Sequence, residues 1–405
     1  MNSLSMREST ANTAQSWSGS RARFSAASAY LAACAALGIQ SPFFPLFLAE
    51  RGLSPDAISL ALALPMAIRL AAMPLAGVVS DHWGAPRLIL MSLGVLGALG
   101  FVCVGLAPNI ALILFSIALA AVFWTPIFPL LDAYALRLAA LRAVDYGRVR
   151  LWGSVSFIAS NVIAGYLLDW MPVVLVVWVI AGAIFAFALS ARALPRFAPP
   201  AIHERRQRLG KPSRVLVLGI LAAAFVQASH AMVYGFSSLD WLSKGIPHSE
   251  IGILWGIGTG AEIVLFYIGT RVTAAVSPLA LIACGGFAAV LRFGAFALDP
   301  PVALIAVLQL LHAFTFGATH LGLMALLGLH VPAHSAGRSQ AYSSAVLGIV
   351  MALAMISAGP LYAHWNVAAY AVYAALGGIG AVIAIIAYSA QPQSAGSGGK
   401  TVAPS

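Results

Sequence analysis

The chain has 405 residues, of which 61% are apolar and only 8% are charged. Soluble domains carry roughly 25% charged residues, so this composition excludes a soluble enzyme and predicts an integral membrane protein. The net charge of +10 does not indicate nucleic-acid binding, because the basic residues flank apolar runs and form no patch interleaved with aromatic residues. Three cysteines lie within apolar runs and show neither disulfide nor metal spacing.

Apolar runs bounded by charge, proline or glycine predict twelve membrane-spanning helices. Each run approaches or exceeds the roughly 20 residues that a helix needs to cross a bilayer. The first six runs lie near residues 24–49, 54–80, 87–107, 109–135, 147–169 and 171–193. The second six lie near residues 213–242, 248–271, 276–297, 300–329, 335–361 and 363–389.

A basic stretch divides these helices into two six-helix bundles. We expect a cytoplasmic amino-terminal tail at residues 1–23, which lacks the apolar core of a cleavable signal peptide. The first bundle covers 24–193, the cytoplasmic linker 194–212 and the second bundle 213–390. The last segment, 391–405, is rich in Gly and Ser and is predicted to be disordered.

The distribution of positive charge predicts the orientation. Of the 22 Lys and Arg residues, 18 fall on the side of the two termini and the central linker. The opposite side holds only Arg51 and Lys244, and Arg69 and Arg292 lie within spans. Since cytoplasmic loops carry the excess of positive charge, both termini are expected in the cytoplasm.

Short patterns recur between the two bundles at nearly one spacing, which indicates two related halves. Membrane transporters built from two related halves carry their solute site at the interface between the halves. The matches are 50–53 with 243–246, 107–113 with 299–305, and 164–165 with 358–359, at offsets of 193, 192 and 194 residues.

Charged residues inside spans are costly and need a reason. Arg69 and Glu262 fall near mid-span, and an offset of 193 superimposes one on the other. They are expected either to lock the bundle as an ion pair or to line a water-filled path, and the second interpretation is preferred. Arg292 lies nearer the end of its span, where a long side chain reaches the interface by snorkelling.

The tenth span presents one polar and aromatic face within an arc of roughly 100°. Such a face is typical of a cavity wall, although a single histidine on an apolar helix is usually a satisfied core group. Histidine also suits proton transfer near neutral pH. The face consists of Gln309, His312, Phe316, Thr319 and His320.

Two further stretches are candidates for function. Asp132 ends one apolar run and Arg150 begins the next, so the two either form a charged pair of a solute site or Arg150 is one of several arginines that mark the cytoplasmic edge. Trp124 belongs to an aromatic and proline cluster, 123–129, that either stacks on a ring-bearing solute or kinks a packed helix. The loop at 77–87 joins an acid at a helix end to a base after a turn, as in a charge relay or an ordinary capped turn.

That loop resembles the signature of the major facilitator superfamily. Gly77, Asp81, Gly84 and Arg87 match its pattern of glycines, acid and base. The departures from it are His82, Ala85 and Pro86. The resemblance implies an all-α fold of twelve helices in two pseudo-symmetric bundles. It also implies that these four residues gate the conformational change.

The run from Asp132 is similar to the lactose permease branch of proton symporters, in which an acid on the fourth helix pairs with an arginine on the fifth. Asp132 and Arg150 take these places, and Glu262, Arg292 and His312 match the branch's glutamate, arginine and histidine on helices eight to ten. The branch's proton-releasing glutamate is replaced by Thr315, and its helix-seven acids have no counterpart between positions 225 and 239. Proton coupling would then rest on Glu262 with His312.

Four sequence segments look like those of the phenylpropionate permease group within this branch. They are PLLDAYA, DYGRVRLWGS, VLRFG and LQLLHAFTFGATH. This resemblance implies proton-coupled uptake of a small aromatic carboxylate such as 3-phenylpropionate. We expect Asp132, Arg150, Arg69, Trp124 and Gln309 to bind the substrate. Glu262, His312 and Arg292 are expected to couple its movement to protons.

The alternatives within the same fold are a sugar or nucleoside proton symporter and a drug–proton antiporter. The antiporter is disfavoured because it would carry a fifth span rich in Gly and Pro, whereas the stretch 153–169 of the fifth span contains no proline. No receptor domain and no nucleophile or metal constellation supports a signalling protein or an enzyme. We therefore expect a monomeric transporter in the inner cell membrane, with protons and a small solute as partners and without cofactor, metal or nucleic acid.

Overall fold

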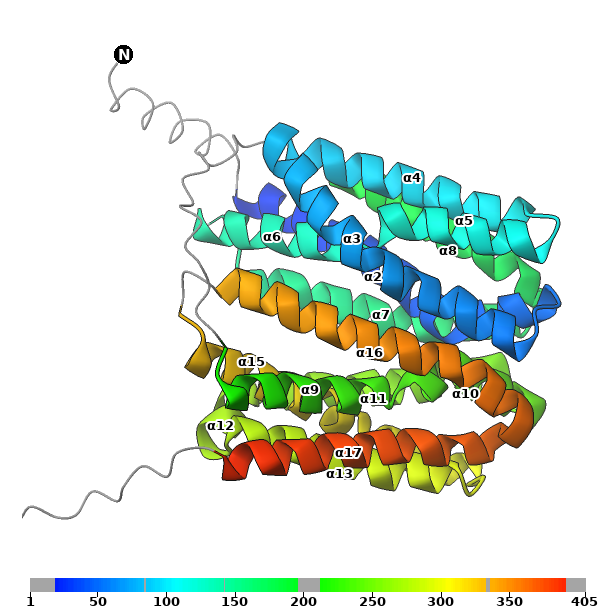
Figure 1. The fold of residues 1–405 in the computed structure, drawn as a ribbon. Helices are drawn as coiled ribbons and strands as arrows, with labels where there is room; N and C mark the ends of the chain where they lie inside the picture. Colours follow the sequence, from blue (N-terminus) through cyan, green and yellow to red (C-terminus); the bar gives the residue numbers. More distant parts are fainter. Residues whose placement is uncertain (1–18, 84, 142, 196–211, 333–335, 391–405) are drawn as a thin grey trace, which may run out of the picture.

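The computed structural model describes residues 19–83, 85–141, 143–195, 212–332 and 336–390, and every regular element in these ranges is a helix. Most of the predicted linker, most of the predicted amino-terminal tail and the whole of the predicted disordered tail lie outside the described residues. The helices stand roughly side by side, so that α2 begins and α17 ends at the same face of the bundle (Figure 1). We call this the terminal face, and the opposite one the distal face.

The first half contains six crossings. They are α2 (Gly19–Glu50), α3 (Pro55–Trp83), α4 (Pro86–Leu106), α5 (Ile110–Trp124) continued by α6 (Ile127–Ala140), α7 (Tyr146–Leu168), and the short η1 (Val173–Leu175) followed by α8 (Val176–Ala191). The first helix begins at Gly19, five residues before the predicted start, because a helix extends beyond its apolar run where polar residues remain in water. The fourth crossing is broken at Pro126, which has no backbone N–H to donate.

The second half repeats this plan. Its helices are α9 (Arg214–Ala228) with α10 (Ala231–Ser243), α11 (His248–Tyr267) with α12 (Gly269–Ala275), α13 (Pro278–Phe296), α14 (Val302–Gln309) with the π-helical η2 (Ala313–Ala318) and α15 (Thr319–His330), α16 (Ala336–Trp365), and η4 (Asn366–Ala369) with α17 (Tyr370–Ser389).

Eleven continuous helical stretches in the described residues are long and apolar enough to cross a membrane. The last of them, Arg338–Ser389, contains both α16 and α17, which run in opposite directions (Figure 1). The described chain therefore crosses twelve times, and the prediction of an all-α fold of twelve helices is confirmed.

The sequence repeat has a structural counterpart at the distal face. Gly52 after α2 and Gly245 after α10 adopt φ values of +78° and +80°, a left-handed conformation that favours glycine. The preceding Arg51 donates to the carbonyl oxygens of Gly105 and Ala107, at 3.2 and 2.5 Å. Each half thus uses a cation at the end of its first helix to hold the turn between its third and fourth helices.

In the second half this cation is Lys244. Its Nζ donates to Asp240 Oδ2 at 2.7 Å and forms an ion pair with Asp299 in the α13–α14 turn. Partial burial opposes the ammonium charge, but the bonds to the two carboxylates outweigh it and raise the pKa of Lys244.

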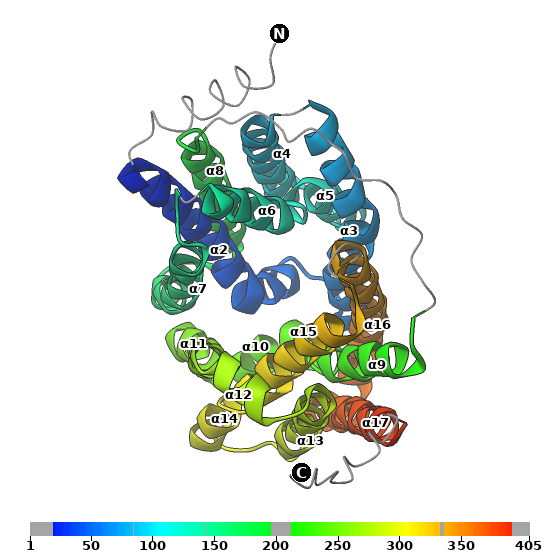
Figure 2. The ribbon, with the colours of Figure 1, turned by 90° about the vertical axis from the view of Figure 1, so that its left-hand side faces the viewer.

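The two halves meet along α7 with α11 and along α3 with α16 (Figure 2). Close backbone approaches at the distal ends require glycine, since a Cβ on Gly165 would collide with His248 and one on Gly359 with Pro55. Asp169 adds contacts across the halves, with its Oδ1 at 3.3 Å from His248 Nδ1 and 3.4 Å from the Ser249 backbone nitrogen. The interface is therefore tightest at the distal face.

Enlarging a distal glycine tests whether these contacts keep that face closed. Gly252 of α11 packs against the Asn161 backbone, so Gly252→Leu is expected to force α7 and α11 apart. Spin labels at the exposed Leu106 and Leu298, one in each half, should report a longer mean distance by double electron–electron resonance. Gly182→Leu is the matched control, because a Cβ there meets nothing within 4 Å. An unchanged distance in Gly252→Leu would remove these contacts from any closing role.

Candidate functional site

A cavity of about 390 Å³ lies between the halves, within the 300–1,000 Å³ typical of small-molecule sites. Its first wall comes from α2, α6 and α7, and its second from α10, α11, α13 and the tenth crossing. Four charged side chains, Asp132, Arg150, Glu262 and Arg292, line it together with aromatic ones such as Phe128, Phe157, Tyr234, Trp255 and Phe316. We call this the charged cavity.

On the first wall, the structure brings Asp132 and Arg150 together, as the resemblance to the lactose permease branch implied. Arg150 Nε lies 3.9 Å from Asp132 Oδ1, and the same oxygen accepts hydrogen bonds from Tyr30 at 2.5 Å and Tyr146 at 3.3 Å. The guanidinium carbon also lies 5.5 Å from the centre of the Tyr30 ring. The pair is therefore held from several directions, although both side chains remain about 40% exposed, at 41% and 37%.

Local sequence explains this placement. The break at Pro126 re-aims α6 so that Asp132 faces α2 and α7, and Asp145 caps α7 by accepting from the Arg148 backbone nitrogen at 3.0 Å. Arg150 then sits in the first turns of α7. Its Nη1 and Nη2 have no hydrogen-bond partner within the described residues, which leaves a planar donor pair suited to a carboxylate.

On the second wall, Arg292 is 1% exposed, so the snorkelling considered from the sequence does not occur. Its Nη2 donates to Gln309 Oε1 at 2.5 Å, and its Nη1 lies 3.2 Å from both His312 Nδ1 and Thr315 Oγ1. Gln309 in turn donates to the Leu254 carbonyl at 2.9 Å. The hydrogen bonds to Arg292 offset part of the free energy that is lost when its guanidinium is removed from water.

The direction of each bond follows from which groups can donate. Arginine has donors only, so His312 Nδ1 must accept, and the proton of the neutral ring sits on Nε2. That Nε2–H points at Glu262 Oε2, 3.3 Å away. His312 is therefore a neutral bridge between Arg292 and Glu262.

His230 was not predicted from the sequence, and it is fully buried at the break between α9 and α10. Its Nδ1 donates to the Gln227 carbonyl at 3.0 Å, so its Nε2 accepts from Thr315 at 2.9 Å. Thr315 thus links Arg292 to His230 where the lactose permease branch carries a glutamate. A polar run, Gln-Ala-Ser-His at 227–230, in the middle of an apolar span was the available signal.

Two predicted substrate residues fall elsewhere. Arg69 of α3 lines neither the charged cavity nor its neighbour, because the neighbouring cavity ends at Met66, one helical turn closer to the distal face. Trp124 lines that neighbouring cavity, where its Nε1 donates to Gln40 Oε1 at 3.0 Å. The expected group of five around one solute is therefore divided over three places.

The remaining predicted residues lie apart from the cavity. Gly77 is in the terminal part of α3, where a Cβ would meet nothing within 4 Å, and Arg87 is in the first turn of α4. Gly84 and the side chain of Asp81 lie outside the described residues. Of the tenth-span face, Gln309, His312 and Phe316 line the charged cavity, while His320 stacks on Phe316 with ring centres 6.1 Å apart.

Twelve apolar crossings in two related halves, with a partly charged cavity between them, define a multi-pass membrane transporter. The chain belongs to the MFS_1 like family, whose model matches residues 24–374. Membership in the major facilitator superfamily, predicted from the 77–87 loop, is thereby confirmed. The family and the relatives below are transporters, so the protein moves a small molecule and is not an enzyme.

Among curated proteins, the chain is 26% identical over 334 residues to a "Probable 3-phenylpropionic acid transporter" of Escherichia coli (strain K12), covering 80% of this chain and 87% of the relative. It is 27% identical over 271 residues to a "Maltose permease" of Geobacillus stearothermophilus, covering 66% and 69%. A crystal structure of a variant of the nucleoside transporter NupG matches with a TM-score of 0.75 at 14% identity, covering 91% of this chain and 99% of that one. This last likeness supports the fold alone.

The Thr315 bridge gives a stability prediction. Thr315→Val leaves His230 Nε2 and an Arg292 N–H without their shared partner, and an unsatisfied buried polar group costs about 1–3 kcal/mol. Unfolding in detergent, followed by tryptophan fluorescence, should show a loss of that size. Thr259→Val is the control, since its hydroxyl bonds only to the Trp255 carbonyl of its own helix. Equal stability of the two variants would mean that the bridge contributes nothing.

Proposed function

We propose that the protein is a proton-driven symporter that takes up a small aromatic carboxylate, with 3-phenylpropionate as its model substrate. The observation that carries this proposal is the charged cavity. One of its walls presents the Nη groups of Arg150, which are unpaired within the described residues, and the opposite wall presents the Glu262 carboxylate, which can accept a proton. The named function of the Escherichia coli relative supports the substrate class.

The balance of charge in the cavity supplies a coupling mechanism. With His312 neutral, Asp132 and Glu262 balance Arg150 and Arg292, so the four lining charges sum to zero. When Glu262 takes up a proton, one positive charge remains in excess. A substrate carboxylate restores neutrality. Binding of the proton therefore strengthens binding of the anion, and binding of the anion strengthens that of the proton to the same degree.

Each charged group then has a distinct role. Arg150 receives the carboxylate through its two Nη groups, and Asp132, fixed by Tyr30, orients the guanidinium. Glu262 exchanges the proton. His312 holds Glu262, and Arg292, itself held by Gln309, keeps His312 neutral, so that only Glu262 changes its charge.

The conformation fits one step of alternating access. The halves are tightest at the distal face, so the cavity is reached from the terminal face, which the positive-inside rule assigns to the cytoplasm. This arrangement corresponds to a state that releases substrate inward. We place the protein in the inner membrane as a monomer with both termini cytoplasmic, and the Gly77–Arg87 loop as the element that changes between states.

A sugar substrate is the second candidate, because a curated relative is named a maltose permease. Sugars need many convergent hydrogen-bonding groups, whereas the cavity beside the charged one is lined by aromatic and methionine side chains. This composition favours a ring-bearing acid.

Uptake by proteoliposomes tests the proposal directly. Labelled 3-phenylpropionate should accumulate when the lumen is more alkaline than the medium, and an imposed membrane potential alone should have no effect. The reason is that one proton enters with one monocarboxylate, so no net charge moves. Uptake of maltose or a nucleoside in place of the acid would overturn the substrate class, and uptake indifferent to the pH gradient would overturn the coupling.

Glu262→Gln separates exchange from accumulation. The amide keeps the cavity in its positive, anion-binding state, so exchange of substrate across the membrane should persist while gradient-driven accumulation falls to background. Glu250→Gln, on the exposed distal start of the same helix, should accumulate substrate normally. Normal accumulation by Glu262→Gln would remove Glu262 from the proton path.

A further inference from the structure

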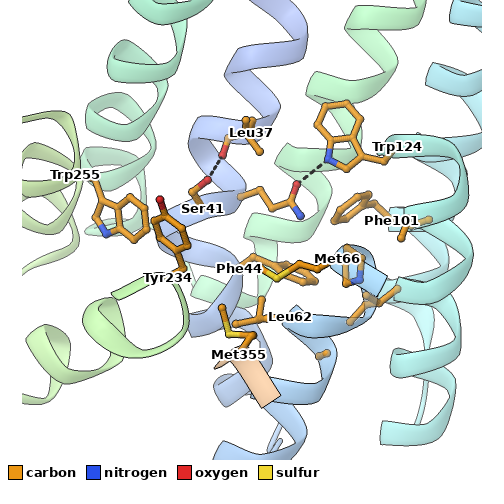
Figure 3. Close-up of a pocket in the computed structure, with 16 residues that line it drawn as sticks. Leu37, Ser41, Phe44, Leu62, Met66, Phe101, Trp124, Tyr234, Trp255 and Met355 are labelled. Atoms are coloured by element: carbon orange, nitrogen blue, oxygen red, sulfur yellow. Dashed lines mark hydrogen bonds between the residues drawn. The ribbon is translucent and has the colours of Figure 1, made fainter. Parts of the chain in front are cut away.

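A second cavity of about 230 Å³ lies beside the charged one (Figure 3). The two share Leu37, Ser41, Tyr234 and Trp255 as lining residues, so they adjoin. We call it the aromatic cavity. Its lining residues include no Asp, Glu, Lys, Arg or His, and it is built chiefly by α2, α3, α4 and α5 of the first half.

Its walls suit an aromatic ring. In Figure 3, Trp255 and Tyr234 lie on one side, Trp124 and Phe101 on the other, and Leu62 and Met355 below them. The Tyr234 and Trp255 rings are stacked, with centres 6.0 Å apart. An apolar cavity of about 150 Å³ is large enough for benzene, so this cavity has room for a phenyl ring with a substituent.

One amide interrupts these apolar walls. The indole Nε1 of Trp124 is a donor only, so its 3.0 Å bond to Gln40 requires that the amide oxygen face Trp124, as the dashed line in Figure 3 marks. The amide nitrogen, Nε2, is left with two N–H donors and has no hydrogen-bond partner within the described residues. Trp124 therefore orients Gln40 so that it offers a donor in a cavity shaped for a ring.

We propose that the aromatic cavity binds the ring of the transported acid, and that Gln40 Nε2 donates to an oxygen carried on that ring. Resting on the proposed function, this names the substrate class more narrowly: propionates whose phenyl ring bears a hydroxyl group. The carboxylate lies at Arg150 in the charged cavity, and the ring passes Tyr234 and Trp255 into the aromatic one.

The experiment measures how well four unlabelled acids compete with labelled 3-phenylpropionate for binding. They are 3-phenylpropionate itself, its 3- and 4-hydroxyphenyl analogues, and hexanoate, which has the carboxylate but no ring. Reconstituted wild-type protein should bind the better hydroxylated analogue roughly 3- to 10-fold more tightly than 3-phenylpropionate, the effect of one net hydrogen bond. Gln40→Met keeps the length of the side chain and removes the donor. It should bring that ratio to about one, because position 40 then offers no hydrogen bond to either acid.

Two further variants complete the test. Gln340→Leu removes an amide from an exposed position on α16 and should keep the wild-type ratio. Trp124→Phe keeps a ring in the wall but frees the Gln40 amide to turn, so it should lower the ratio part of the way.

Failure of the two proposals is distinguishable. If none of the acids competes or is taken up, the proposed function is wrong. If 3-phenylpropionate is transported and Gln40→Met keeps the wild-type ratio, or if hexanoate binds as well as 3-phenylpropionate, the acid transporter stands and the ring subsite is overturned.

Discussion

The buried guanidinium of Arg292 constrains the whole second wall of the cavity. A charge that is 1% exposed is tolerated only where acceptors converge on it, and Gln309, His312 and Thr315 supply them. Because arginine only donates, it fixes the ring proton of His312 on the side of Glu262. One cation thus sets both the protonation and the orientation of the neighbouring histidine.

On both walls of the cavity, each carboxylate is bound by a partner from its own half of the protein. Asp132 and Arg150 are paired within the first half, and Glu262 is held by His312 within the second. Among the described cavity residues no ion pair joins one half to the other, so the halves separate there without breaking one. Contacts that do cross the interface include the glycine approaches and the Asp169 contacts at the distal face, and a hydrogen bond from Ser59 to the Ile356 carbonyl at 3.3 Å.

Sequence reasoning succeeded where a single physical rule dominates. Apolar length located the crossings to within a few residues, and the repeat at 50–53 and 243–246 reappears as two left-handed glycines after a cation. The meeting of Asp132 with Arg150 was implied by the resemblance to the lactose permease branch, while apolar length alone left Arg150 at the cytoplasmic edge. By contrast, Arg69 was assigned to the substrate from its depth in a span, and depth alone does not tell where a cavity ends.

What the sequence could not supply was the convergence of side chains from distant helices. Tyr30 reaches Asp132 across 102 positions, and His230 reaches Thr315 across 85. Neither pair has a periodicity or a motif. The orientation of Gln40 likewise depends on which way the Trp124 indole points, and only packing decides that.

The π-helical segment Ala313–Ala318 fixes the rotation of the last part of the tenth crossing. Its wider turn lets residues four apart stand above one another, and the rings of His312, Phe316 and His320 stack in line, with interplanar angles of 22° and 8°. A π-helical turn holds about one residue more than an α-helical turn. If the same residues formed an ordinary α-helix, that extra residue would turn everything after the segment by about 100°, and His320 would leave the line of rings. The wide turn therefore keeps residues from both ends of this crossing on one face.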